Sequence, residues 1–278
     1  MTAQQHDADG INVKTFEEVD DASKVQDYIR ILDDFDRLSG IQTLKKAAIE
    51  RCQIRPGMSV LDVGCGTGLE TVRLARLVAP SGHVTGVDLS DDLLAEARRR
   101  ASGLGLPIDY RQGNAEQLPL PDHAFDIARA ERLLLYLDDP AKAVAELVRV
   151  TKPNGIVYVI EPDFETVTIN LDDRSVVRKV LHFDCDNDTK DGWIGRQLPR
   201  MFRAAGLIDV VVETGVVIFD SQEFSSYFLE IGRAALQNTV ITATEHQYWQ
   251  SGIEDLLSRD ELFCTITYFM VLGRVPAA

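Results

Sequence analysis

The stretch Met58-Ser59-Val60-Leu61-Asp62-Val63-Gly64-Cys65-Gly66-Thr67-Gly68 decides the fold of this chain. Its aliphatic first half has the composition of a short buried strand, and its glycines let a turn pass close to a ligand before a helix begins at Leu69. The spacing is G-x-G-x-G, whereas the dinucleotide fingerprint G-x-G-x-x-G would need glycine at position 69. The stretch therefore predicts a strand, a ligand-binding turn and a helix that differ from a nicotinamide-binding unit.

Further short apolar runs follow the first one and alternate with segments of helical periodicity. The predicted strands cover residues 83–89, 108–113, 124–130 and 156–160, and two later strands are expected at 210–219 and 263–275. Strands that alternate with helices of about three turns are typical of βαβ units. The pattern therefore predicts an α/β fold with a largely parallel sheet.

Additional segments flank and interrupt this alternation. Residues 1–20 are polar, without a period, and are expected to form a flexible tail, while 21–55 predict N-terminal helices. Insertions at 163–191 and 221–258 are mainly helical in pattern, and we expect them to form a cap over one end of the sheet. Residues 21–278 are thus predicted to be a single domain.

The composition restricts the kinds of partner. The 29 Lys and Arg residues against 44 Asp and Glu give a formal net charge of -15, which repels nucleic acid and anionic lipid surfaces. The four cysteines form no C-x-x-C pair and have no histidine at metal-ligand spacing, so we expect neither a disulfide framework nor a metal site. The N-terminal residues do not resemble a signal peptide, which favours a cytoplasmic protein. The oligomeric state stays open, and a homodimer is one possibility.

Polar residues stand where the predicted strands end, which is where open parallel sheets bind ligands. Asp88 lies 20 residues beyond Gly68, the separation at which an acid reaches the two hydroxyls of a ribose. Asn114, after the next strand, offers donors and an acceptor that suit an adenine edge. Alone, each has a simpler interpretation, a solvated strand-end acid or a turn asparagine, but together with the glycines they predict a nucleoside site.

These residues resemble the class I S-adenosylmethionine-dependent methyltransferases, and in particular the ubiquinone and menaquinone methyltransferases. The segment 61–68 looks like the first motif of that family, 87–90 like the second, 113–116 like the third, and Phe125-Asp126 with Glu131 like the fourth. The resemblance implies a Rossmann-like, seven-stranded, mostly parallel sheet with helices on both faces, an antiparallel last strand and bound S-adenosylmethionine.

The resemblance also implies roles for individual residues. The glycine turn would pack against the methionine part of the cofactor, Asp88 would hold the ribose, and Glu131 would lie near the amino-acid end. Tyr28 either closes over the methionine part or simply packs in the core. The cofactor-binding residues implied in this way are Tyr28, Asp62, Gly64, Cys65, Gly66, Gly68, Asp88, Leu89, Asn114, Ala115 and Glu131.

Methyl transfer requires a nucleophile aligned with the sulfonium methyl group and the exclusion of water, and a phenol or alcohol acceptor also benefits from a base. His182 and His246, in the predicted cap, are the candidate catalytic bases, with a structural or exposed histidine as the alternative. The long cap suggests a small-molecule acceptor that is a bulky apolar natural product or a quinone-like compound. Candidate acceptor-pocket residues, for which helix core is the equal alternative, are Trp193, Arg196, Tyr227 and Phe228.

Two other functions fit the same motifs. The protein could bind S-adenosylmethionine and catalyse a rearrangement or cyclisation, with the sulfonium acting only as an electrostatic aid. It could also be a regulatory binding module, although the complete set of glycines with Asp88 and Asn114 argues against a lost cofactor site.

Overall fold

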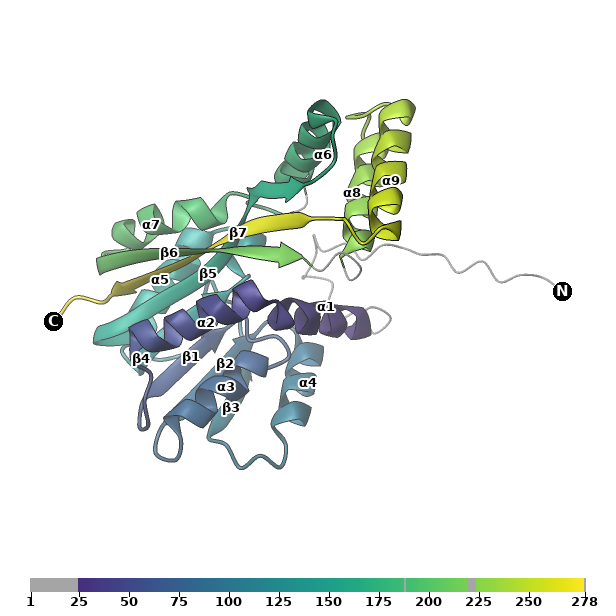
Figure 1. The fold of residues 1–278 in the computed structure, drawn as a ribbon. Helices are drawn as coiled ribbons and strands as arrows, with labels where there is room; N and C mark the ends of the chain where they lie inside the picture. The colour runs from purple at the N-terminus through teal and green to yellow at the C-terminus, as the bar shows by residue number, and fades with distance from the viewer. Residues whose placement is uncertain (1–24, 188, 220–223, 278) are drawn as a thin grey trace.

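The computed structural model describes residues 25–187, 189–219 and 224–277, and the predicted tail lies outside them. Its centre is a seven-stranded sheet in the order β3-β2-β1-β4-β5-β7-β6 (Figure 1). The strands β1 to β5 are parallel, and β7 is antiparallel to both neighbours, which confirms the predicted sheet. The strands are β1 Ser59–Val63, β2 His83–Asp88, β3 Ile108–Gln112, β4 Phe125–Glu131, β5 Thr151–Ile169, β6 Ile208–Phe219 and β7 Cys264–Arg274.

Helices cover both faces of the sheet, and each face has its own apolar core. Leu44 of α2 and Leu74 of α3 belong to one buried cluster, and Leu147 of α5 and Leu198 of α7 belong to the other. The helices are α1 Val25–Arg37, α2 Ser39–Cys52, α3 Leu69–Val78, α4 Asp91–Ala101, α5 Pro140–Val150, α6 Arg174–Asn187, α7 Ile194–Ala204, α8 Ser225–Gln237 and α9 Ala243–Ser258, with a 3₁₀ turn at Leu134–Tyr136.

Several helix starts follow directly from the local sequence. The Ser90 side chain accepts a hydrogen bond from the Leu93 amide at 3.1 Å and begins α4. Asp139 caps α5, whose first residue is proline. Thr242 and Glu245 form the capping box of α9 that the T-x-x-E spacing predicts.

The strand β5 differs from the prediction, because it has 19 residues and reaches Ile169 instead of ending at residue 160. Residues 163–169 are therefore mainly strand, not part of the first helical insertion. The reason is long-range: β7 pairs with β5 beyond Asp163, as far as Ile169, after a register shift. Apolar residues of this extension, Val167 and Ile169, are buried in the same cluster as Val180 of α6.

The cap consists of α6, α8 and α9, which stand together beyond one end of the sheet (Figure 1). The second insertion is thus two helices, and its first residues, 221–223, lie outside the described part. Trp249 of α9 is fully buried, and its indole nitrogen donates to the Phe228 carbonyl of α8 at 2.7 Å. A Cβ on Gly232 would lie 2.3 Å from the Trp249 ring, so the close packing of α8 and α9 requires glycine there.

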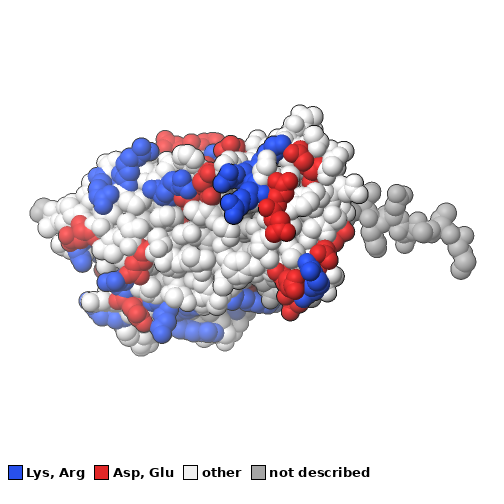
Figure 2. Space-filling view, turned by 45° about the horizontal axis from the view of Figure 1, so that its top comes forward, with Lys and Arg blue, Asp and Glu red and all other residues white. Residues whose placement is uncertain are grey.

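The surface is mixed in charge on the face that Figure 2 shows, where acidic and basic side chains surround an uncharged central band. The edge strand β6 exposes apolar side chains, among them Val216 and Ile218. All four cysteines are free and buried. Within the described ranges, no helix combines the length and the apolar character needed to cross a membrane.

Candidate functional site

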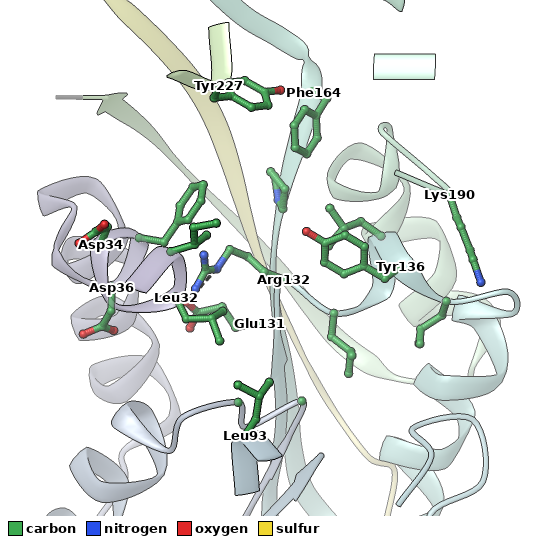
Figure 3. A pocket seen from close by; sticks show the side chains of 18 of the residues that line it. Leu32, Asp34, Asp36, Leu93, Glu131, Arg132, Tyr136, Phe164, Lys190 and Tyr227 are labelled. Atoms are coloured by element: carbon green, nitrogen blue, oxygen red, sulfur yellow. Dashed lines mark ion pairs between the residues drawn. The ribbon is translucent and has the colours of Figure 1, made fainter. Parts of the chain in front are cut away.

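A cavity of about 1190 Å³ runs from the glycine turn after β1 to the space below the cap. The carboxyl ends of β1, β2 and β4 form one wall, and α1, α6 and α8 contribute others. In Figure 3, Leu93 lies at one end, Arg132 and Glu131 lie in the middle, and Phe164 and Tyr227 lie at the other end. We call the region around the glycine turn and Leu93 the cofactor end of the cavity, and the region around Phe164 and Tyr227 the cap end.

The glycine turn at the cofactor end has a geometry that only glycine adopts easily. Gly64, Gly66 and Gly68 have φ angles of 70°, 50° and 77°. The amide nitrogens of Gly64 and Cys65 both donate to the Val87 carbonyl, at 2.7 and 3.1 Å, so the turn is tied to β2. A Cβ on Gly64 would meet the Leu133 side chain at 3.1 Å. The turn is thus fixed in place, and Gly64, Cys65 and Gly66 line the cavity.

Asp88 at the end of β2 is directed at this turn. Its carboxylate accepts hydrogen bonds from the Gly66 amide at 2.7 Å and from the Ser90 amide at 3.1 Å. Burial raises the pKa of Asp88 although these amides act in the opposite direction. Next to it, Leu89 is 55% exposed and lines the cavity, which suits the flat face of a base. The side-chain oxygen of Asn114 accepts from the Glu116 backbone amide at 2.8 Å, which leaves the side-chain nitrogen of Asn114 to donate.

A buried network of charges lies behind the turn. Asp62 of β1 and Arg129 of β4 are register partners on neighbouring strands, and their side chains form an ion pair of 2.7 Å. Asp62 also accepts from the Thr71 hydroxyl at 2.7 Å, so it organises the turn from behind. Arg129 also pairs with Glu131 at 2.5 Å, and Lys45 of α2 lies 3.2 Å from the same carboxylate.

This network keeps Glu131 ionised at the cavity wall. Burial acts to raise the pKa of Glu131, but Lys45 and Arg129 outweigh it and hold that pKa at about 2. Sequence reasoning found Glu131 but missed Lys45 and Arg129. Arg129 could have been noticed in the sequence, because it stands between Ala128 and Ala130 in the predicted strand 124–130, and a buried arginine needs a partner.

The cofactor end fits S-adenosylmethionine. The glycine turn lines the cavity beside Asp88, an acid at ribose-binding spacing, and the exposed Leu89 with Asn114 suits an adenine. The ionised carboxylate of Glu131 suits the cationic amino group of an amino acid.

Comparisons with known proteins agree with this geometry. The family described as "Methyltransferase domain" matches residues 61–159. The demethylmenaquinone methyltransferase of Geobacillus stearothermophilus is 30% identical over 200 residues, which are 64% of this chain and 86% of that protein. The chain belongs to the class I S-adenosylmethionine-dependent methyltransferases. Its cofactor is S-adenosylmethionine.

Alignments with two other proteins cover more of this methyltransferase. An uncharacterized 37.1 kDa protein in transposon TN4556 of Streptomyces fradiae is 32% identical over 255 residues, covering 91% of this chain and 72% of that protein. Among solved structures, the [4+2]-cyclase SpnF superposes with a TM-score of 0.53 at 26% identity, covering 86% of this chain and 82% of that chain. Both alignments extend well beyond the residues that match the methyltransferase family.

Most residues predicted to bind the cofactor come together at the cavity. Gly68 is the N-cap residue of α3 and does not line the cavity, and a Cβ there would collide with Tyr110 and Ala97. Tyr28 is 1% exposed and packs in a small cluster with Leu93, which corresponds to core packing, the alternative interpretation. The predicted residues that do line the cavity are Asp62, Gly64, Cys65, Gly66, Asp88, Leu89, Asn114, Ala115 and Glu131.

The candidate bases are not brought to this cavity. His182 of α6 lies 3.3 Å from Glu165 and borders a separate, small cavity between α6 and β5. His246 of α9 lines neither cavity. The placement of both follows from the helical phase of the cap, which turns these positions away from the space below it.

The acceptor-pocket candidates divide in the same way. Tyr227 lines the cavity, and its hydroxyl donates to the Asp184 carboxylate at 2.5 Å. Phe228, the next residue, is buried in the core. Trp193 is 47% exposed, and the Arg196 guanidinium lies over its ring, so neither reaches the cavity. The sequence analysis missed Arg132, Tyr136 and Asp184, which all line the cavity.

Proposed function

We propose that this methyltransferase transfers a methyl group to a small molecule with a bulky apolar body. The observation that carries the proposal is the continuity of one cavity from the cofactor end to a cap end with aromatic and aliphatic walls. Such a wall favours a ligand that loses apolar surface to it. The side chains at the cap end include Phe164, Phe183, Phe219, Phe224, Tyr227 and Ile231.

The mechanism assigns separate tasks to the two ends. When bound, S-adenosylmethionine supplies an electrophilic methyl group on a sulfonium. Asp88 and Asn114 would hold the nucleoside, and the ionised Glu131 would accept hydrogen bonds from the amino group of the cofactor. The apolar wall of the cap end would exclude water and position the acceptor, and positioning of this kind contributes on the order of 7–11 kcal/mol.

The test uses S-adenosylmethionine with a deuterated methyl group. The enzyme is incubated with this donor and, separately, with the low-mass and the macromolecular fractions of a bacterial extract. We expect the heavy methyl group to appear in the low-mass fraction together with S-adenosylhomocysteine. Label found only in protein or nucleic acid would rule out a small-molecule acceptor.

A second candidate function is a cyclisation or rearrangement with the cofactor bound but not consumed. The observation that favours it is the likeness to the [4+2]-cyclase over 86% of this chain. Product mass separates the two candidates. A cyclisation gives a product isomeric with its substrate, without the heavy methyl group and without S-adenosylhomocysteine.

A further inference from the structure

Arg132 follows β4 directly and has an unusual backbone. Its φ angle of 48° lies in the left-handed region, which costs free energy for a residue other than glycine. The Arg132 amide donates to the Ile160 carbonyl at 2.9 Å, so β5 fixes this conformation. Next along the chain, the amides of Leu133 and Leu134 both donate to one oxygen of the Glu161 carboxyl group, at 2.9 and 2.7 Å. Three hydrogen bonds therefore hold the backbone of Arg132 and of the two residues after it. They fix the point from which the Arg132 side chain extends, in spite of the unfavourable φ angle.

The Arg132 guanidinium rests on an aromatic surface. It lies 4.6 Å from the centre of the Phe35 ring, and Phe35 packs in turn against Phe219 and Phe224 with ring centroids 6.3 and 5.1 Å apart. The side chain is only 16% exposed. A stacked guanidinium keeps its in-plane N–H groups available to a second ligand.

Those N–H groups lack a matching acceptor. Among the described residues, the Arg132 side chain donates no hydrogen bond, and its buried Nε has no hydrogen-bond partner. The carboxylate of Glu131 lies 3.8 Å from that Nε, which is beyond hydrogen-bond distance. Burying a guanidinium in this way is unfavourable unless an anion completes the site.

The position of Arg132 indicates which ligand supplies that anion. Figure 3 places it in the middle of the cavity, between Leu93 at the cofactor end and Phe164 and Tyr227 at the cap end. We propose that Arg132 binds an ionised oxygen of the acceptor, such as a carboxylate, phenolate or enolate. The acceptor class is therefore an aromatic or extended apolar acid, an inference that rests on the proposed function.

This proposal also accounts for the missing base. A cation next to an acidic oxygen favours its ionised form, so an acceptor held by Arg132 needs no histidine to remove its proton. The competing interpretation is that Arg132 binds the carboxylate of the cofactor. The two interpretations predict different losses when the arginine is replaced.

The experiment uses two fluorescent probes in protein saturated with S-adenosylhomocysteine. 8-Anilinonaphthalene-1-sulfonate is an apolar anion, and N-phenyl-1-naphthylamine is nearly the same molecule without the sulfonate. We expect wild-type protein to bind the anion more tightly. Arg132→Gln should weaken binding of the anion by about 10-fold or more, with the affinities for the neutral probe and for S-adenosylhomocysteine unchanged.

Two variants make the result specific. Arg233→Gln removes a cavity-lining arginine that is 48% exposed and paired with Glu230, and it should leave both probes unaffected. Arg132→Lys, which keeps the charge, should recover part of the anion affinity. Equal loss of both probes would mean a structural role, and loss of S-adenosylhomocysteine affinity would assign Arg132 to the cofactor; either result overturns the proposal. The probes need no turnover, so their result is independent of the methyl-transfer test.

Discussion

The two ends of the cavity are built by different means. At the cofactor end, a run of consecutive residues after β1 and single acids at strand ends form the site, and the buried charges behind it are paired. At the cap end, side chains from α6, α8, β5 and the β4–α5 connection meet only through tertiary packing, and the charge of Arg132 lacks a full partner. Local geometry therefore builds the cofactor end, whereas long-range contacts build the cap end.

The largest expected effect tests the paired charges of the cofactor end. Arg129→Met removes the partner of Asp62 and Glu131 and leaves two buried carboxylates, so we expect the free energy of unfolding to fall by about 3–5 kcal/mol. Thermal denaturation measures this loss, at roughly 2–4 °C per kcal/mol. The control is Arg111→Met, an exposed arginine paired with Asp109 on β3, which should change little. Similar melting curves for the two variants would mean that the buried network contributes nothing to stability.

The next effect concerns cofactor affinity. Asp88→Ala removes the carboxylate that accepts from the Gly66 and Ser90 amides and faces the predicted ribose, so affinity should fall about 30- to 1,000-fold. Titration calorimetry with S-adenosylhomocysteine measures it. Asp91→Ala, at an exposed acid at the start of α4, should leave affinity nearly unchanged. If Asp88→Ala binds as wild type does, the ribose contact is assigned to the wrong residue.

The difference between local geometry and long-range contacts also explains which features could be predicted from the sequence. The G-x-G-x-G turn, the Ser90 cap and the strand-end acids are local, and the structure has each of them in the expected element. The extension of β5 to Ile169 depends on its pairing with β7, about a hundred residues away along the chain. No local sequence pattern predicts such a pairing. The same holds for Arg132, whose importance comes from a left-handed backbone and a ring on α1. Residue type alone makes His182 and His246 candidate bases, whereas the direction in which they face depends on the helical phase in the folded cap.

Glu161, which accepts from the amides of Leu133 and Leu134, gives a pH-dependent prediction. It is fully buried, and burial raises its pKa to about 8, above the ordinary value near 4.3. The folded state therefore binds a proton that the unfolded state releases, and stability from this group falls as pH rises between these values. Glu161→Gln keeps an acceptor for the Leu133 and Leu134 amides but cannot ionise.

Urea denaturation at pH 6 and pH 7.5 measures this difference. We expect the wild type to lose up to about 2 kcal/mol more than Glu161→Gln over that interval, because one proton contributes at most about 1.4 kcal/mol per pH unit. Equal pH dependence in the two proteins would show that Glu161 does not titrate in this range.

The smallest expected effect separates the cap from the cofactor end most cleanly. Thr242→Ala removes the hydroxyl that accepts from the Glu245 amide at 3.2 Å and so breaks the capping box of α9. Loss of such a cap costs about 1 kcal/mol of stability. Thr244→Ala, an exposed threonine in the same first turn, is the matched control and should be close to neutral.

Because α9 packs on α8 through Trp249 and the cofactor contacts lie elsewhere, Thr242→Ala should weaken binding of N-phenyl-1-naphthylamine slightly and leave S-adenosylhomocysteine affinity unchanged. A parallel loss of cofactor affinity would mean that the cap and the cofactor end fold as one energetic unit.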